Sequence, residues 1–313
     1  MSNAESTEEF SSERHLVSSI IPELSFKAHK GVNGRIAVVG GCREYTGAPF
    51  FSAISALKLG ADLVYVFCTQ DAAPVIKSYS PELIVYPLLD RTTALEEMIP
   101  ILPKMHSIVI GPGLGRNDLL LSTIGGLINK VKDMDIPMVL DADSLYFICK
   151  CPDIVRGYSK AILTPNAAEF DRLYATVYSG EQHKNAQESV SELCKTLGGI
   201  TIVRKGREDT ISDGNVTAIC NEQGSPRRCG GQGDLLSGFL ATFAHWSHDA
   251  FAAEDKRNQV QKYTANVLAA LGACMLTRRC NRLAFAKLGR STTTTDMIAE
   301  IRNAFCALFP IDS

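Results

Sequence analysis

Residues Arg35–Cys68 read RIAVVGGCREYTGAPFFSAISALKLGADLVYVFC, and this stretch decides the expected fold. It opens and closes with apolar runs of strand length, Arg35–Gly40 and Asp62–Cys68. Between them, Ala48–Lys58 has the length and the small apolar residues of a helix. A strand, a helix and a second strand in this order predict a βαβ unit with two parallel strands.

Similar segments continue along the chain, and their apolar runs are almost unbroken, as expected for strands covered on both faces. The further strands are expected at Leu83–Tyr86, Ser107–Ile110, Met138–Leu140, Ala161–Leu163 and Ile200–Arg204. The further helices are expected at Leu119–Lys132, Glu169–Tyr174, Ala186–Leu197, Leu235–Trp246 and Gln261–Arg278. The pattern predicts an α/β fold with a mainly parallel central sheet. No linker divides it, so we expect a disordered tail at 1–24 and a single domain at 25–313.

The composition is that of an ordinary soluble protein: 45% of the 313 residues are apolar, 21% are charged, and the formal net charge is −2. It indicates neither a nucleic-acid nor a membrane partner. We expect no transmembrane segment, secretory signal or mitochondrial transit peptide. The ten cysteines include no C-x-x-C pair, which argues against a zinc site and a disulfide framework. We therefore expect reduced thiols and a cytoplasmic location.

Glycine clusters directly after strands mark the expected site, because open α/β sheets bind ligands beyond the carboxyl ends of their strands. Four clusters occur, at Gly40–Gly41, Gly111–Gly115, Gly206 and Gly230–Gly233. GPGLG at Gly111–Gly115 could be only a turn, or its backbone could lie against a planar ring or a phosphate. It lacks the G-x-G-x-x-G pattern with a downstream acid, which argues against an ordinary dinucleotide-binding dehydrogenase.

The strongest motif is GSPRRCGGQGDLLSG at Gly224–Gly238, where glycines and one aspartate precede an apolar helical pattern. Bare backbone amides and a helix N-terminus can hold a phosphate. Asp234 could be only a helix cap. Beside an anion hole flanked by Arg227 and Arg228, it is better interpreted as a base that deprotonates a hydroxyl attacking a γ-phosphate.

Three other motifs leave a structural and a functional interpretation open. The turn Lys205–Asp209 offers donors for a nucleotide's phosphates, although K-G after a strand is often only a turn. Asn166 and Glu169 could orient waters around Mg²⁺, or they could form a capping box. Asp141 and Asp143 could contact substrate or metal, or cap a helix. The tract Thr292–Thr295 before Asp296 is best interpreted as an N-cap region.

Taken together, these motifs resemble those of the NAD(P)H-hydrate dehydratases of the ribokinase superfamily, in the eukaryotic, ATP-using branch. The matching segments run in order from Lys30 to Gly238: KGVNGRIAVVGGCREYTGAPFFSAISALKLGADLVYVF, GPGLGR, LDADSL, TPNAAEFDRL, KGRED and GSPRRCGGQGDLLSG. The resemblance implies a ribokinase-like three-layer α/β/α fold. It also implies the substrates: ATP, and the hydrates of NADH and NADPH.

The resemblance further implies roles for particular residues. ATP would contact Lys205, Gly206, Arg207, Glu208, Asp209, Gly224, Ser225, Pro226, Arg227, Arg228, Cys229 and Gln232. The hydrated nicotinamide substrate would contact Gly115, Asn166, Ala167, Ala168, Glu169, Phe170, Asp171 and Arg172. Asp234 would be the catalytic base beside Gly230, Gly231 and Gly233. Magnesium would accompany ATP near Glu169, although Ala168 stands where kinases of the superfamily more often carry a polar group.

These residues suit a dehydration that goes through a phosphate ester. Hydroxide is a poor leaving group, and phosphorylating the hydroxyl of the hydrated ring makes it a good one. Two other functions stay open: a small-molecule kinase of the same superfamily acting on a vitamin precursor, and a nucleotide-binding protein that has lost catalysis. A homo-oligomer is compatible with the apolar helix faces, and so is burial of those faces within one chain.

Overall fold

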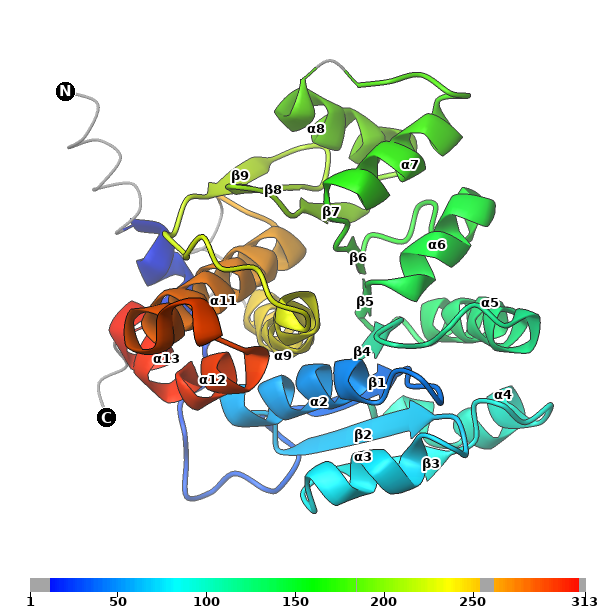
Figure 1. The fold of residues 1–313 in the computed structure, drawn as a ribbon. Coiled ribbons are helices and arrows are strands. Elements are labelled where there is room, and N and C mark those ends of the chain that lie inside the picture. Colours follow the sequence, from blue (N-terminus) through cyan, green and yellow to red (C-terminus); the bar gives the residue numbers. More distant parts are fainter. Residues whose placement is uncertain (1–11, 184, 254–261, 310–313) are drawn as a thin grey trace.

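The computed structural model describes residues 12–183, 185–253 and 262–309 (Figure 1). Its centre is one sheet with the strand order β3-β2-β1-β4-β5-β6-β7-β8-β9. The strands are β1 (Arg35–Val39), β2 (Leu63–Cys68), β3 (Ile84–Pro87), β4 (Ser107–Ile110), β5 (Met138–Leu140), β6 (Ala161–Leu163), β7 (Thr201–Arg204), β8 (Asp209–Ser212) and β9 (Thr217–Cys220). Strands β1 to β7 are parallel to one another, whereas β8 pairs antiparallel with β7 and with β9.

Helices cover both faces of this sheet (Figure 1). The α-helices are α2 (Gly47–Leu59), α3 (Ala73–Tyr79), α4 (Ala94–Met98), α5 (Asp118–Asp133), α6 (Asp143–Lys150), α7 (Ala167–Val177), α8 (Ala186–Thr196), α9 (Gln232–Ala252), α11 (Ala265–Leu288), α12 (Thr294–Ala299) and α13 (Ile301–Leu308). Short 3₁₀ turns lie at η1 (Leu102–Lys104), η2 (Pro152–Ile154) and η3 (Gly289–Ser291). Among the described residues, no helix combines the length and apolarity needed to cross a membrane.

Alternate residues of strands β1 to β7 supply two separate cores. In β1, Ile36 and Val38 belong to a cluster formed with α2, α3, α9, α11, α12 and α13. Ala37 and Val39 belong to a second cluster formed with α4, α5, α6, α7 and α8. Because strands buried on both faces must be apolar at every position, the unbroken apolar runs of the sequence follow directly from this three-layer arrangement.

The seven strands expected from the sequence are all present, as β1 to β7. The hairpin of β8 and β9 was missed, because its strands have four residues each and mix polar with apolar side chains. Thr293, in the expected cap region, caps α12 and forms a capping box with Asp296. The expected start of the last long helix, Gln261, lies outside the described residues, and α11 begins at Ala265.

The expected disordered tail at 1–24 is wrong for its second half. Residues 12–20 are helical, and Val17 and Ile20 are buried in the core that α9 and α11 share. Their apolar side chains recur three residues apart, which places them on one face of the helix. Residues 1–11 lie outside the described part of the chain.

The chain turns that matter most lie at one edge of the sheet. Gly40 follows β1, Gly111 follows β4, Asp141 follows β5, Pro165 comes two residues after β6 and Lys205 follows β7. Parallel strands end at the same edge, so all five motifs meet there. The backbone amide of Lys205 donates to the carbonyl of Pro165 at 2.8 Å, which joins two of them.

Candidate active site

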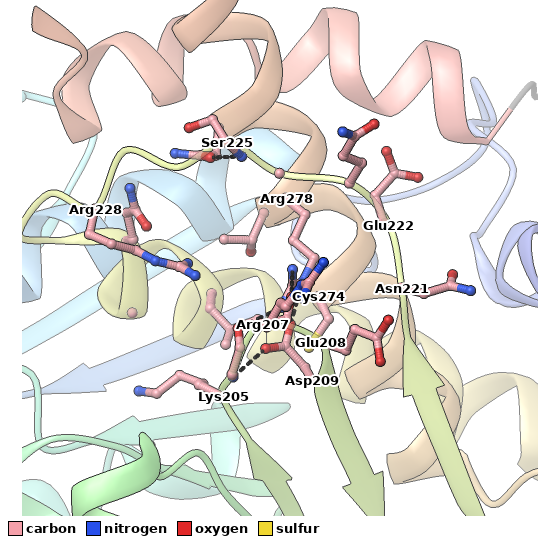
Figure 2. A pocket seen from close by; sticks show the side chains of 18 of the residues that line it. Lys205, Arg207, Glu208, Asp209, Asn221, Glu222, Ser225, Arg228, Cys274 and Arg278 are labelled. Atoms are coloured by element: carbon pink, nitrogen blue, oxygen red, sulfur yellow. Dashed lines mark hydrogen bonds and ion pairs between the residues drawn. The ribbon is translucent and has the colours of Figure 1, made fainter. Parts of the chain in front are cut away.

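A pocket of about 500 Å³ opens between the β8–β9 hairpin, the start of α9 and the middle of α11 (Figure 2). Its lining residues are Lys205, Gly206, Arg207, Glu208, Asp209, Asn221, Glu222, Gln223, Gly224, Ser225, Pro226, Arg228, Gln232, Gly233, Leu236, Cys274, Thr277, Arg278 and Asn281. The turn after β7 and the loop before α9 thus form facing walls. The sequence predicts that both segments, Lys205–Asp209 and the loop that begins at Gly224, contact ATP.

Arg278 of α11 fixes the turn after β7 (Figure 2). Its guanidinium donates to Asp209 Oδ2 at 2.7 Å, to the Arg207 carbonyl at 2.8 Å and to the Gly206 carbonyl at 3.1 Å. Asp209 Oδ1 accepts a hydrogen bond from the Gly206 amide at 3.0 Å. The buried Asp209 carboxylate is therefore used to shape the turn, which leaves Lys205 and the backbone to meet a ligand.

The loop before α9 is held by α11 and α12. Asn281 Oδ1 accepts from the Ser225 amide at 2.7 Å, and Thr294 Oγ1 donates to the Gly230 carbonyl at 2.6 Å. Gly231 has φ +93°, and a Cβ built on it would lie 2.7 Å from Cδ2 of Phe51. Only glycine fits there, because both the backbone conformation and the close approach exclude a side chain.

Asp234 lies in the first turn of α9, and the residue at the N-cap is Gly231. The interpretation of Asp234 as a helix cap is therefore wrong. The pKa of its carboxyl is raised to about 7: burial is the largest cause, the negative charge of Asp141 adds to it, and Lys205 partly offsets it. A half-buried carboxyl that gains and loses its proton near neutral pH suits a general base.

Asp141, Thr164 and Lys205 form a polar cluster beside this turn. Asp141 Oδ1 accepts from Thr164 Oγ1 at 2.8 Å and from Lys205 Nζ at 3.0 Å. A Cβ built on Gly233 would lie 3.4 Å from Lys205 Nζ and 3.8 Å from Asp141 Oδ2. Asp141, whose role the sequence left open between a ligand contact and a helix cap, thus belongs to an ion pair directly against the glycine loop.

Asn166 and Glu169 form the capping box of α7. Asn166 Oδ1 accepts from the Glu169 amide at 3.0 Å, and Glu169 Oε2 accepts from the Asn166 amide at 2.8 Å. Within residues 12–183, 185–253 and 262–309, no group of three or more His, Cys, Asp or Glu could hold a metal ion. Of the two interpretations of this motif, the structural one is therefore confirmed, and any metal role for Glu169 has to be shared with a ligand.

The rest of the segment assigned to the substrate is divided between surface and core. Asn166, Ala167, Ala168, Asp171 and Arg172 are exposed. Asp171 pairs with His183 at 2.8 Å. The Phe170 side chain is fully buried in the core that covers the second face of the sheet, so only its backbone is left to contact a ligand. None of this segment lines the pocket described above.

Gly115 lies on a neighbouring part of the same sheet edge. Its amide donates to Asp143 Oδ2 at 2.9 Å, and Arg116 Nε donates to Asp143 Oδ1 at 3.0 Å. A Cβ on Gly111 would lie 1.8 Å from the Asp141 carbonyl, so glycine is required for the turns after β4 and β5 to pack together. Asp143 therefore holds the GPGLG turn in place.

Ten of the twelve expected ATP-binding residues line the pocket, and two, Arg227 and Cys229, do not. Gly230 and Gly231, which were expected beside the base, also lie outside its wall. Arg227 Nε donates to the Thr292 carbonyl at 3.2 Å, and Gln232 Nε2 approaches Cys229 Sγ at 3.2 Å. The sequence missed eight lining residues, namely Asn221, Glu222, Gln223, Leu236, Cys274, Thr277, Arg278 and Asn281. A sequence signal for one of them is the arginine pair Arg278–Arg279, which interrupts an otherwise apolar stretch of α11 and indicates a polar contact there.

The family model for NAD(P)H-hydrate dehydratase matches residues 36–303 of this chain. The chain belongs to this family. Among its relatives, an ATP-dependent (S)-NAD(P)H-hydrate dehydratase from Rattus norvegicus is 54% identical, over 98% of this chain and 88% of the relative. Proteins of the same name from Ixodes scapularis and Homo sapiens are each 52% identical, over 96% and 98% of this chain and 96% and 87% of theirs.

Solved structures of this family and of related kinases share the fold. The ADP/ATP-dependent NAD(P)H-hydrate dehydratase from Bacillus subtilis, co-crystallised with ATP and Mg²⁺, has a TM-score of 0.70 at 20% identity, covering 95% of this chain and 97% of its own. Hydroxyethylthiazole kinase from Pyrococcus horikoshii has a TM-score of 0.61 at 14% identity, covering 96% and 94%. The ribokinase-like three-layer fold expected from the sequence is thereby confirmed.

Proposed function

We propose that this chain uses ATP to dehydrate the S-form of hydrated NADH and NADPH, with release of ADP and phosphate. Its relatives at 52 to 54% identity carry that activity in their names. The observation that carries the proposal within the site is Asp234: a carboxyl with a pKa of about 7 follows directly on Gly233, which lines the pocket. This carboxyl would serve as the base beside the terminal phosphate of a nucleotide bound in the pocket.

The pocket supports ATP as the co-substrate. The turn Lys205–Asp209 would bind phosphates through Lys205 and backbone amides, and the loop Gly224–Gln232 would cover the nucleotide from the other side. The N-terminus of α9 points its unpaired amides toward the same place, which favours an anion. Asp209, Arg227 and Cys229 would act indirectly, by shaping these segments.

The reaction then follows from the positions of the residues. Asp234 accepts the proton of the hydroxyl on the hydrated ring, and the oxygen attacks the γ-phosphorus of ATP, releasing ADP. The amides of Gly230, Gly231 and Gly233 stabilise the charge on the transferred phosphoryl group. The lone pair of the ring nitrogen expels phosphate, and loss of the proton on the neighbouring carbon restores the dihydronicotinamide.

The substrate would lie between Asp234 and the exposed side of the capping box of α7. Asn166, Ala167, Ala168, Asp171 and Arg172 present that surface, and Gly115 presents a bare backbone beside it. Phe170 supports this surface from the core.

Magnesium fits this site as an ion brought by ATP. Mg²⁺ keeps several waters and commonly takes only one or two carboxylates together with substrate phosphates. Glu169 uses Oε2 in the capping box, and its second oxygen is the ligand we propose for a magnesium-bound water. The ion would neutralise charge on the phosphates during transfer.

We also place the enzyme in the cytoplasm and propose one domain over residues 25–313. All ten cysteines are free thiols, which suits a reducing compartment. One sheet joins the described residues from β1 to β9, which supports the single domain.

The test is to incubate the protein with hydrated NADH, Mg²⁺ and either ATP or ADP, and to follow absorbance of the dihydronicotinamide together with free phosphate. We expect both to appear at equal rates with ATP. Asp234→Asn should lower turnover by roughly 10² or more while ATP still binds, because general bases contribute on that scale. A stable phosphorylated product without free phosphate would instead establish the kinase.

A further inference from the structure

Asp141 is the buried charged group nearest to the glycine loop that no role above requires. It is 2% exposed, and its Oδ1 accepts hydrogen bonds from Thr164 and from Lys205. A buried carboxylate is costly unless it is paired. The ion pair with Lys205 offsets this cost. A neutral side chain at this position, hydrogen-bonded to Thr164, would fill the same space.

The ion pair of Asp141 and Lys205 lies beside the first turn of α9, which carries Asp234. The second oxygen of Asp141, Oδ2, faces Gly233 at 3.8 Å from a Cβ built there, and Lys205 Nζ lies 3.4 Å from the same point. Gly233 and Asp234 are consecutive in the first turn of α9. Lys205 also lines the nucleotide pocket, and Figure 2 shows its ammonium group pointing away from Asp209. One cation, that of Lys205, therefore lies at the pocket, beside Asp141 and close to the first turn of α9.

We propose that Asp141 is a positioning residue that acts on Asp234 through its own charge and by holding the ammonium group of Lys205 at the mouth of the nucleotide pocket. The inference rests on the proposed function, because it assigns Asp234 as the base. Asp141 itself is not among the residues that line the pocket. Its effect on the reaction passes through the other two side chains.

The charged neighbours of Asp234 make the direction of the effect clear. Asp141, after β5, raises the pKa of Asp234, and Lys205, after β7, lowers it. Glu169, at the start of α7, faces Lys205. At the N-cap residue Gly231, α2 and α12 present Phe51 and Thr294, and neither of these side chains ionises. Arg278 of α11 is held by Asp209.

Burial alone would lower the pKa of Lys205, but the carboxylates of Asp141, Glu169 and Asp234 together raise it. The lysine therefore stays charged, and the cluster has more carboxylates than cations. Under these conditions one carboxyl keeps a proton near neutral pH, and Asp234 is the one whose pKa shows it. Removing the charge of Asp141 would reduce this excess of negative charge and lower the pKa of Asp234.

The test reads the protonation of Asp234 directly, by NMR of protein labelled with ¹³C at the aspartate carboxyl carbon, with Asp234→Asn used to assign the signal. Asp141→Asn should lower the pKa of Asp234 by about one unit or more, because a like charge is removed. Lys205→Met should raise it. Asp143→Asn, which removes a carboxylate of the same sheet edge that pairs with Arg116, should leave it unchanged.

Opposite shifts in Asp141→Asn and Lys205→Met establish the proposal, and an Asp234 signal that titrates alike in both variants and in the wild type overturns it. If Asp141→Asn does not fold, the upward shift in Lys205→Met still decides the outcome. The acidic limb of the kcat/KM profile for hydrated NADH should move with the NMR value. A wild type that is inactive on hydrated NADH would refute the proposed function while the titration still tests the inference.

Discussion

The carboxylates gathered at the carboxyl edge of the sheet have the same chemistry and different partners. Asp209 is held by Arg278, Asp143 by Arg116 and the Gly115 amide, and Glu169 by the capping box. Asp141 is paired with Lys205. Asp234 is the one of these whose pKa is raised to about 7. A cation or a hydrogen-bond donor stabilises the charged form of a carboxylate and so favours the loss of its proton. Within the part of the chain that the structure describes, Asp234 has no such cation in an ion pair, and its carboxyl can therefore exchange a proton near neutral pH.

The raised pKa of Asp234 makes a prediction about stability. The folded pKa, about 7, exceeds the unfolded value near 3.9, so the folded state binds more protons between these pH values. Stability is then lost as pH rises through this window. Asp234→Asn removes the charge and should be more stable than the wild type at pH 8, by up to about 4 kcal/mol, with little difference at pH 4. Thermal unfolding at both pH values measures it, and an equal difference at both would contradict it.

Two adjacent glycines of the loop should respond differently to alanine. Gly231→Ala should cost about 1–3 kcal/mol, because φ +93° is strained for alanine and its Cβ would meet Phe51 at 2.7 Å. Gly230→Ala is the matched control: a Cβ there meets nothing within 4 Å, and Gly230 is absent from the residues with positive φ. Its stability should stay within about 0.5 kcal/mol of the wild type. Urea denaturation compares the two, and equal losses would show that the loop is not constrained as described.

At the scale of the elements, the site is built where strands end and one long helix begins. Strands β1 and β4 to β7 deliver their motifs to one edge, because parallel strands end together. Helix α9 brings Gly233 and Asp234 to that edge, and α11 crosses behind the pocket with Arg278 and Asn281. The chemistry therefore depends on helix ends and turns whose backbone is fixed by side chains from elsewhere.

The capping box of α7 allows its structural role to be separated from a catalytic one. Asn166→Ala should lower the stability of the protein by about 1 kcal/mol, because it removes an N-cap bond. Glu169→Gln should keep the stability, since glutamine also serves at the third position of a capping box. The melting temperatures and the KM for ATP with Mg²⁺ are to be measured for both. A rise in KM for Glu169→Gln without a fall in melting temperature would support its proposed metal role, and an unchanged KM would end it.

At the scale of the whole molecule, the sheet is extended by the β8–β9 hairpin, and this extension makes the outer wall of the proposed nucleotide pocket. Helix α11 packs against the hairpin and against α9, so it joins the two walls. A binding site between elements far apart in the chain depends on the packing of the entire fold. A change in α11 should therefore reach both stability and binding.

Arg278→Met tests this coupling. The arginine is largely buried and holds Asp209 and two carbonyls of the Lys205–Asp209 turn, so its loss should cost about 3 kcal/mol. It should also reduce the rise in melting temperature on adding ATP, which for the wild type corresponds to about 2.7 kcal/mol at 100 times Kd. Arg282→Met, one turn further along α11 at a more exposed ion pair, should keep that rise. Retention of the full ATP effect in Arg278→Met would refute the role of α11.

The sequence by itself determined the strands β1 to β7, the three-layer class and the motif around Asp234, because apolar periodicity and glycine punctuation are local properties of the chain. Only the tertiary structure decided that Asp234 is not a cap, that Glu169 completes the capping box of Asn166, and that Phe170 is buried. It also decided that Arg278 and Asn281 complete a pocket, and that Asp141 pairs with Lys205. Hydrogen bonds, ion pairs and desolvation act between residues far apart in sequence, so they exist only once packing has brought those residues together.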